Sequence, residues 1–162
     1  MAGNIILELE GVEGESEDSV LKAKIDISSF SFGLSNMAAG SLGKGSSAGT
    51  ADLADISLQK TMDKSSTMLF INCAKGQHHP TATLHIRKTG GDDTPKDYLK
   101  YTLNEVYITS YSTGGSEGGG LPSESFSLNY AKIKMEYFIQ DADGIMQPAG
   151  EQTYDVKQNK KV

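Results

Sequence analysis

The sequence contains no tryptophan, only one cysteine (Cys73) and only 4 prolines in 162 residues. One cysteine cannot form an intramolecular disulfide, so a secreted scaffold stabilised by disulfides is excluded. A chain of this length buries roughly 70% of the surface that its unfolded form exposes, so a hydrophobic core suffices without metals or crosslinks. The sequence therefore predicts one domain, residues 1–162, that needs no cofactor.

Basic residues are also scarce. The chain has 15 lysines and arginines against 21 acidic residues, which gives a formal net charge of −6. Such a surface repels phosphate backbones and anionic lipids, so we expect neither nucleic-acid binding nor stable membrane association. The apolar runs are short, and Glu8 interrupts the first one, so the sequence predicts neither a transmembrane segment nor a signal peptide.

Alternation of apolar and polar residues is the dominant pattern, and it is typical of half-buried β-strands. Ile56 and Leu58 alternate with Ser57, and residues 5–10 and 82–87 show the same period. The sequence therefore predicts a mainly β protein.

The alternation changes parity within three longer stretches. Leu103 at an odd position is followed by Val106 at an even one, and residues 25–34 and 126–137 contain the same change. A one-residue slip would expose a core face, so each change predicts a β-bulge or a strand that passes between two buried environments. Long bent strands favour a small antiparallel β-barrel of two packed curved sheets. The alternative is burial on both faces, by the core and by a neighbouring subunit.

One helix is predicted beside this barrel. Residues 63–67 offer several N-cap candidates before the mostly apolar residues 68–74, and Gly76 ends the segment as a C′ glycine. Leu69 and Cys73 lie one turn apart, so we expect both to face the barrel. The fold class is therefore a barrel with one flanking α-helix and long loops.

No motif supports a catalytic or metal site. Residues 45–49 read Gly-Ser-Ser-Ala-Gly and match the nucleophile elbow of serine hydrolases, with Ser47 as the nucleophile. That elbow needs an apolar strand before the serine and a helix after it, whereas the flanking residues here are small and of low complexity. His78 and His79 lack ligand partners at metal-binding spacing. We therefore expect no enzyme, and a serine hydrolase using Gly45 to Gly49 is an alternative.

The order of motifs along the chain resembles the Hcp (haemolysin-coregulated protein) family, the tube proteins of type VI secretion systems. The aromatic-x-aromatic-Gly strand is present with Phe where tryptophan is common in the family, and Thr67 replaces a frequent proline. The matching segments are residues 11–16, 25–33, Lys60 with residues 63–65, the helix ending at Gly76, and residues 85–91, 98–113, 124–137 and 154–159.

The resemblance implies a structural role in secretion. Hcp proteins form hexameric rings that stack into a tube inside a contractile sheath, and the tube leaves the bacterium beneath a VgrG-type spike. Their ring lumen holds small effector proteins. The protein would therefore be in the bacterial cytoplasm before firing and then be secreted outside, or into a target cell, without a signal peptide. A phage-like tail-tube protein is the alternative with the same architecture.

Two regions are candidates for these contacts. Ser29 and Ser31 alternate with Phe30 and Phe32, so we expect them to face the lumen and contact cargo, and an ordinary wet strand face is the alternative. Residues 38–50 are too long for a hairpin turn and rich in glycine. We expect this loop to contact stacked rings or adjacent subunits through Gly40, Ser41, Leu42, Gly43, Lys44 and Gly45.

Overall fold

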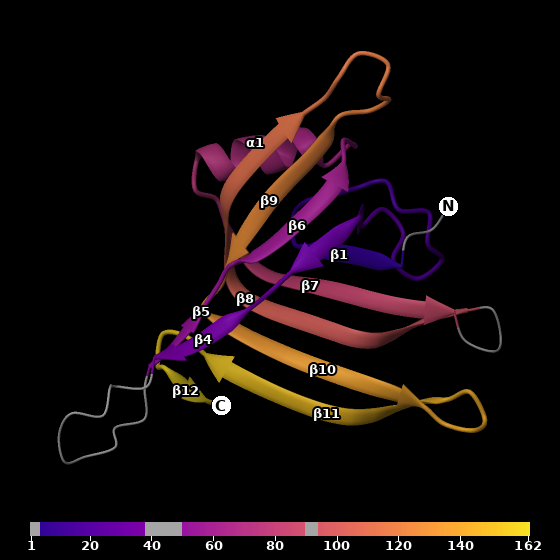
Figure 1. The fold of residues 1–162 in the computed structure, drawn as a ribbon, viewed down its shortest axis with the longest axis vertical. Helices are drawn as coiled ribbons and strands as arrows, with labels where there is room; N and C mark the ends of the chain where they lie inside the picture. The colour runs from indigo at the N-terminus through magenta and orange to yellow at the C-terminus, as the bar shows by residue number, and fades with distance from the viewer. Residues whose placement is uncertain (1–3, 38–49, 90–93) are drawn as a thin grey trace.

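β-Strands make up most of the computed structural model, which describes residues 4–37, 50–89 and 94–162 (Figure 1). The elements before the helix are β1 (Ile5–Leu9), β2 (Ile25–Asp26), β3 (Ser29–Ser31), β4 (Leu34–Met37), β5 (Thr50–Leu53) and β6 (Ile56–Thr61). They are followed by α1 (Ser66–Ala74), β7 (His78–Thr89), β8 (Pro95–Gly114), β9 (Ser123–Asn129), β10 (Lys132–Gln140), β11 (Met146–Asp155) and β12 (Lys160–Lys161). The predicted mainly β fold with a helix beside it is confirmed.

The 20-residue strand β8 joins two branches of one antiparallel sheet. Its N-terminal half pairs with β7 and β10, whereas residues 107–114 pair with β9. The first branch has the order β12-β11-β10-β8-β7-β1-β2, and the second runs from β8 through β9 and β6 to β3. Strands β4 and β5 form a separate hairpin. Side chains from both branches meet in one core.

The described strands do not close into a barrel, which corrects the prediction on this point. The first branch ends at β12 on one side and at β2 on the other, and no pairing among the described strands joins these edges. The branches diverge after they share β8 and pack against each other (Figure 1), and their edge strands β2 and β3 are linked by residues 27 and 28 without pairing with each other. Alternation identifies the buried face of a strand but not the strands that pair with it. Closure of a barrel depends on that pairing.

Two of the three parity changes have structural causes of the kind that the sequence predicts. Between the buried residues Leu103 and Val106, Glu105 has a φ of 55°, in the left-handed region. The pairing of β8 with β9 shifts register between Ile108 and Ser110. The change within residues 126–137 falls between β9 and β10. Both the bulged strand and the passage to another part of the sheet are therefore present.

Helix α1 packs on the core through a few side chains. Leu69 is fully buried and Cys73 packs against the core, as expected. At the start of the helix the Asp63 carboxylate accepts a hydrogen bond from the Ser65 backbone N–H (2.8 Å). At its end Gly76 adopts a φ of 64°, which a residue with a Cβ rarely adopts.

Aromatic side chains connect the two branches. The Phe30 ring lies 6.1 Å from the Tyr101 ring between centroids, and the Phe32 ring lies 5.7 Å from it. Phe32 also contacts Tyr130, which lies between β9 and β10. These contacts hold the segment around β3 over β8, so phenylalanines connect the layers in this tryptophan-free core.

Candidate functional site

Small polar side chains line the outer side of β3, β6, β9 and the C-terminal half of β8. We call this surface the serine face. Strand pairing aligns its side chains in two rows that cross these strands: Ser31, Ser57, Ser127 and Ser110 in the first, and Ser29, Gln59, Ser125 and Ser112 in the second.

Alternation creates this face because the intervening residues belong to the core. In β9, Phe126 and Leu128 are buried, whereas Ser125 and Ser127 are half-buried on the other side. In β6, Leu58 is fully buried beside exposed neighbours. Successive side chains of a strand point to opposite faces, so the hydrophobic core forces the hydroxyl groups outward.

Hydrogen bonds between neighbouring strands connect the rows. The Ser110 hydroxyl donates to Ser127 Oγ (2.8 Å), and the hydroxyls of Ser112 and Ser125 lie 2.6 Å apart. Ser29 donates to Gln59 Oε1 (3.3 Å). Serine and glutamine side chains are uncharged, so both rows present hydroxyl and amide groups without fixed charge. Such a surface is wet and attracts neither acidic nor basic proteins strongly.

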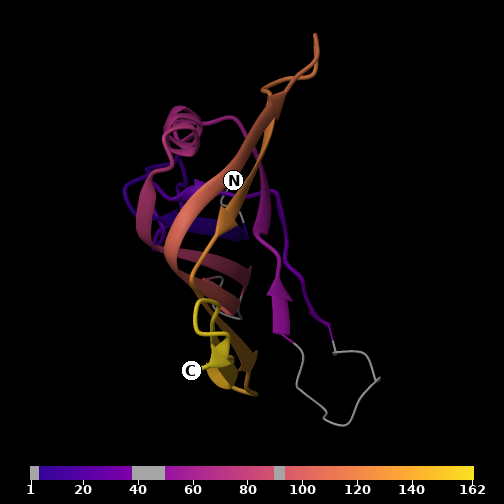
Figure 2. The same ribbon diagram turned by 90° about the vertical axis from the view of Figure 1, so that its left-hand side faces the viewer.

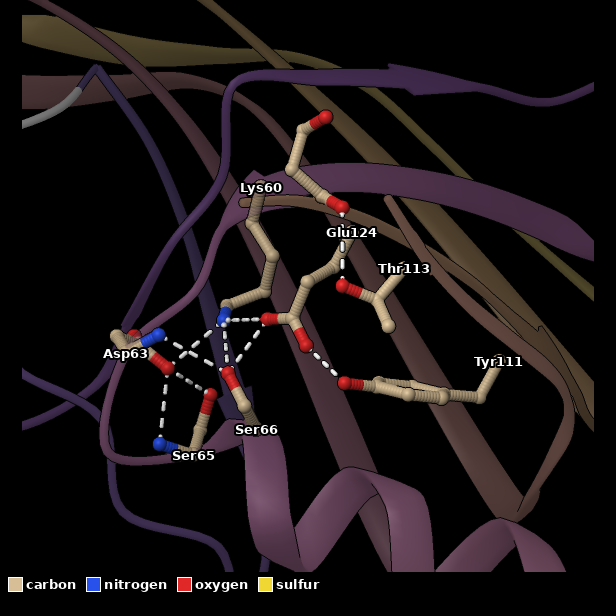
Figure 3. Close-up of polar contacts among 8 residues, drawn as sticks. Lys60, Asp63, Ser65, Ser66, Tyr111, Thr113 and Glu124 are labelled. Carbon is tan, nitrogen blue, oxygen red and sulfur yellow. Dashed lines mark hydrogen bonds and ion pairs between the residues drawn. The ribbon is translucent and has the colours of Figure 1, made fainter. Parts of the chain in front are cut away.

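A buried ionic cluster lies behind the serine face, on the core side of β6 and β9 (Figure 3). Lys60 Nζ is 2.7 Å from Glu124 Oε1 and 2.7 Å from Asp63 Oδ1. The side chains of Lys60 and Glu124 are 0% exposed. Glu124 also accepts hydrogen bonds from the hydroxyls of Ser66 and Tyr111. The cluster therefore ties the start of α1 to three strands.

The ionisation states in this cluster follow from its contacts. Burial acts to raise the pKa of Glu124, but hydrogen bonds from Lys60, Ser66 and Tyr111 outweigh burial and lower it. Burial, together with the hydrogen bond to Glu124, raises the pKa of Tyr111 to about 12. The carboxylate is therefore charged and the phenol protonated at neutral pH. With every oxygen of Glu124 engaged, the cluster has a structural role rather than a catalytic one.

The structure places the two predicted lumen serines on one face and leaves the predicted loop untested. Ser29 and Ser31 are exposed on β3, with Phe30 turned to the core between them. The candidate contact residues Gly40, Ser41, Leu42, Gly43, Lys44 and Gly45 lie outside the described residues, as does the serine motif at residues 45–49.

Most of the serine face was missed by reasoning on the sequence. Of its residues, only Ser29 and Ser31 are predicted individually from the sequence, although Ser125 and Ser127 alternate with Phe126 in the same way. That alternation is the signal that could have identified the other strands of the face. Their alignment into rows needed the pairing register.

In the part of the chain that the structure describes, no group of three or more His, Cys, Asp or Glu side chains could hold a metal ion. Within the same residues, no helix has the length and apolar character needed to cross a membrane.

Comparison with known proteins identifies the family. Residues 6–137 match the family described as "Type VI secretion system effector, Hcp". The chain is 39% identical over 144 residues to Protein hcp1 of Pseudomonas aeruginosa, which covers 89% of this chain and 88% of that protein.

Solved structures agree with this match. A structure titled "Structure of a type six secretion system protein" has a TM-score of 0.89 at 29% identity and covers 99% of this chain and 100% of the other. Hcp1 from Salmonella typhimurium has a TM-score of 0.78 at 29% identity, with 100% of both chains covered. The chain therefore belongs to the Hcp family of type VI secretion proteins.

Proposed function

We propose that this protein is the tube subunit of a type VI secretion system, in which hexameric rings stack with the serine face toward the lumen. Membership of the Hcp family favours this function over the phage tail-tube alternative and over a serine hydrolase. Residues 1–162 act as one domain and supply one subunit. The serine face carries the proposal, because a passage for folded cargo needs a surface that is wet and without strong fixed charge.

Exposed apolar side chains support self-association. On β10, Met135, Tyr137 and Ile139 are each 46–50% exposed, although they share the side of the strand that buries Ile133. Beside them, a groove of about 310 Å³ separates the β4–β5 hairpin from β10 and β11, which stand apart in Figure 2. A neighbouring subunit would cover this surface. If this surface contacts a different surface of the next subunit, the contact is head-to-tail. Repeated head-to-tail contacts form a ring when the rotation from one subunit to the next adds up to a full circle.

The other partners follow from the proposed tube. Small effector proteins bind in the lumen against Ser31 and Ser29, the contractile sheath surrounds the stacked rings, and a VgrG-type spike precedes them. Residues 40–45 contact the next ring or subunit. The protein resides in the bacterial cytoplasm before firing and is then secreted outside, or into a target cell.

Thiol accessibility in assembled rings tests the orientation of the serine face. In a Cys73→Ser background, Ser31→Cys places a thiol on the face, and Ser116→Cys places one in the exposed β8–β9 loop. Light scattering and negative-stain microscopy first establish rings of six. We expect a small maleimide to label both variants, and a maleimide on a large polyethylene glycol to label Ser116→Cys much faster. Equal labelling by the large reagent would reject the lumen assignment, and a monomer would reject the ring.

A further inference from the structure

Side chains of alternating charge form a continuous chain on the outer face of β1, β7 and β8, opposite the core. We call it the charge chain, and its order is Lys24, Glu8, His85, Asp97, Arg87 and Asp18. Successive charged atoms are separated by 3.4, 2.8, 2.8, 3.4 and 2.6 Å. Both end members, Lys24 and Asp18, lie in the loop of residues 10–24 that connects β1 to β2.

Hydrogen bonds within the loop at residues 10–24 give it a defined shape. The Gly14 N–H donates to the Ala23 carbonyl (2.8 Å), and the Ala23 N–H donates to the Ser16 carbonyl (2.8 Å). The Asp18 carboxylate accepts hydrogen bonds from the N–H groups of Val20 and Leu21 at 2.9 Å. The charge chain therefore connects a pre-shaped loop to the sheet at two points.

The contacts of His85 require a charged ring. Its Nδ1 is 2.8 Å from Asp97 Oδ2, and its Nε2 is 2.8 Å from Glu8 Oε1. A neutral imidazole has only one N–H and would turn a lone pair toward one of these carboxylates, whereas an imidazolium donates to both. The side chain is 10% exposed. Burial acts to lower the pKa of His85, but the hydrogen bonds and charges of Asp97 and Glu8 outweigh it and raise the pKa.

Other charged groups around His85 come from every element packed against it. On β8, Lys100 pairs with His85, and its Nζ lies 3.5 Å from Glu136 Oε2 of β10. On β2, Asp26 pairs with Ile6 and lies on the same face of the sheet. Among the described residues, the charged groups around His85 on these elements are Glu8, Asp18, Lys24, Asp26, Arg87, Lys96, Asp97, Lys100 and Glu136. Of the residue types in the charge chain, only histidine ordinarily titrates between pH 5 and 8.

We propose that His85 is a proton-operated latch, whose imidazolium holds residues 10–24 against β7 and whose deprotonation at alkaline pH releases this loop. Without the proton, Glu8 or Asp97 faces a lone pair and turns away. Because Glu8 binds Lys24 and Asp97 binds Arg87, which in turn holds Asp18, either movement loosens one end of the loop.

Solvent reaches the latch through a cavity of about 400 Å³. Its lining includes Val20 and Leu21 from the loop, together with His85, Arg87 and Asp97. Val20 is 69% exposed, so the cavity opens beside the loop that moves.

The sign of the effect follows from the raised pKa. A histidine whose pKa is higher in the latched state stabilises that state fully below its ordinary pKa of about 6.5. The stabilisation is lost as the pH rises through the raised value. Each unit by which the pKa of His85 differs between the latched and the released state changes the latching equilibrium about tenfold.

The experiment uses the full chain at several pH values. Two-dimensional NMR of the histidine ring nitrogens measures the pKa of His85, and hydrogen exchange corrected for intrinsic rates measures protection of residues 10–24. We expect His85 to titrate above 6.5, with both nitrogens protonated in the latched state. Protection of the loop from hydrogen exchange should fall over the same pH range, by about tenfold for each unit by which the pKa of His85 differs between the two states. Protection of β9 should stay constant.

Variants separate the latch from general pH effects. His85→Gln should abolish the pH-dependent step and leave the loop poorly protected throughout. His78→Gln, which alters a histidine on the same strand paired with Glu105, should keep the step. A wild-type His85 titrating at or below 6.5 would overturn the proposal, as would loop protection that does not change with pH or a step that survives in His85→Gln. If that variant does not fold, the wild-type titration and exchange decide alone.

Discussion

Replacement of Glu124 by glutamine tests the buried ionic cluster most directly. The change keeps the shape of the side chain but leaves the Lys60 ammonium, 0% exposed, with Asp63 as its remaining acidic partner. Breaking a buried ion pair by neutralising one member costs about 3–5 kcal/mol. Because Asp63 still compensates part of the charge, we expect Glu124→Gln to lower the free energy of unfolding by about 3 kcal/mol.

Urea unfolding at pH 7 measures this loss, at a protein concentration where light scattering shows a single oligomeric state. The matched control is Glu13→Gln, which removes an ion pair to Lys64 in which both side chains are more than 60% exposed. Water and salt screen an exposed pair of this kind, so the control should unfold almost like the wild type. A loss for Glu124→Gln as small as that of the control would refute the structural role of the cluster.

The pH dependence of this difference provides a second readout. The pKa of Glu124 is lowered in the folded state, so its contribution is present above the unfolded value of about 4.5 and is lost as the pH falls through the folded value. The difference in the free energy of unfolding between wild type and Glu124→Gln should therefore become smaller below pH 4.5. A gap that stays constant to pH 3 would show that charge is not the cause.

Three other substitutions are predicted from single contacts. Ser31→Arg should abolish retention of co-expressed effector in purified rings and leave the rings intact, because it places a charge on the serine face. Asp18→Asn should move acid unfolding, followed by circular dichroism, to higher pH, since Arg87 and backbone N–H groups lower the pKa of Asp18 to about 2 against the effect of burial. Gly14→Ala should cost about 1–3 kcal/mol in urea unfolding, because the new Cβ would lie 2.4 Å from the Lys24 carbonyl oxygen.

Each of these substitutions has a control or an opposing result. Ser116→Arg, in the β8–β9 loop, should retain effector, and equal retention by Ser31→Arg would contradict the lumen assignment. An unchanged acid midpoint in Asp18→Asn would contradict the pairing with Arg87. Gly33→Ala meets no atom within 4 Å and should be tolerated, so equal losses at both glycines would contradict the steric explanation.

The positions of Ser29 and Ser31 on an exposed face could be predicted because alternation with Phe30 decides which side of β3 is buried. The same rule placed the parity change near Glu105 without identifying its left-handed backbone. Closure of the sheet could not be predicted, because a strand pattern does not say which edges meet. The rows of the serine face depend on register between distant strands, which no local pattern contains.

The buried cluster left a signal in the strand alternation. Lys60 follows Ile56 and Leu58 at the same parity, and Glu124 precedes Phe126 in the same way. Each charge therefore occupies a core position of its strand. The sequence could have predicted two buried charges of opposite sign, but it could not show that β6 and β9 are neighbours, which is what lets these charges pair.

Strand β8 has a mechanical consequence. Its 20 residues span roughly 65 Å at the usual rise per residue, and its two ends belong to different branches of the sheet. A force that separates the branches must therefore load a covalent backbone and shear many ladder hydrogen bonds together, instead of opening them one at a time. A subunit built in this way resists pulling along β8 and unfolds as one unit.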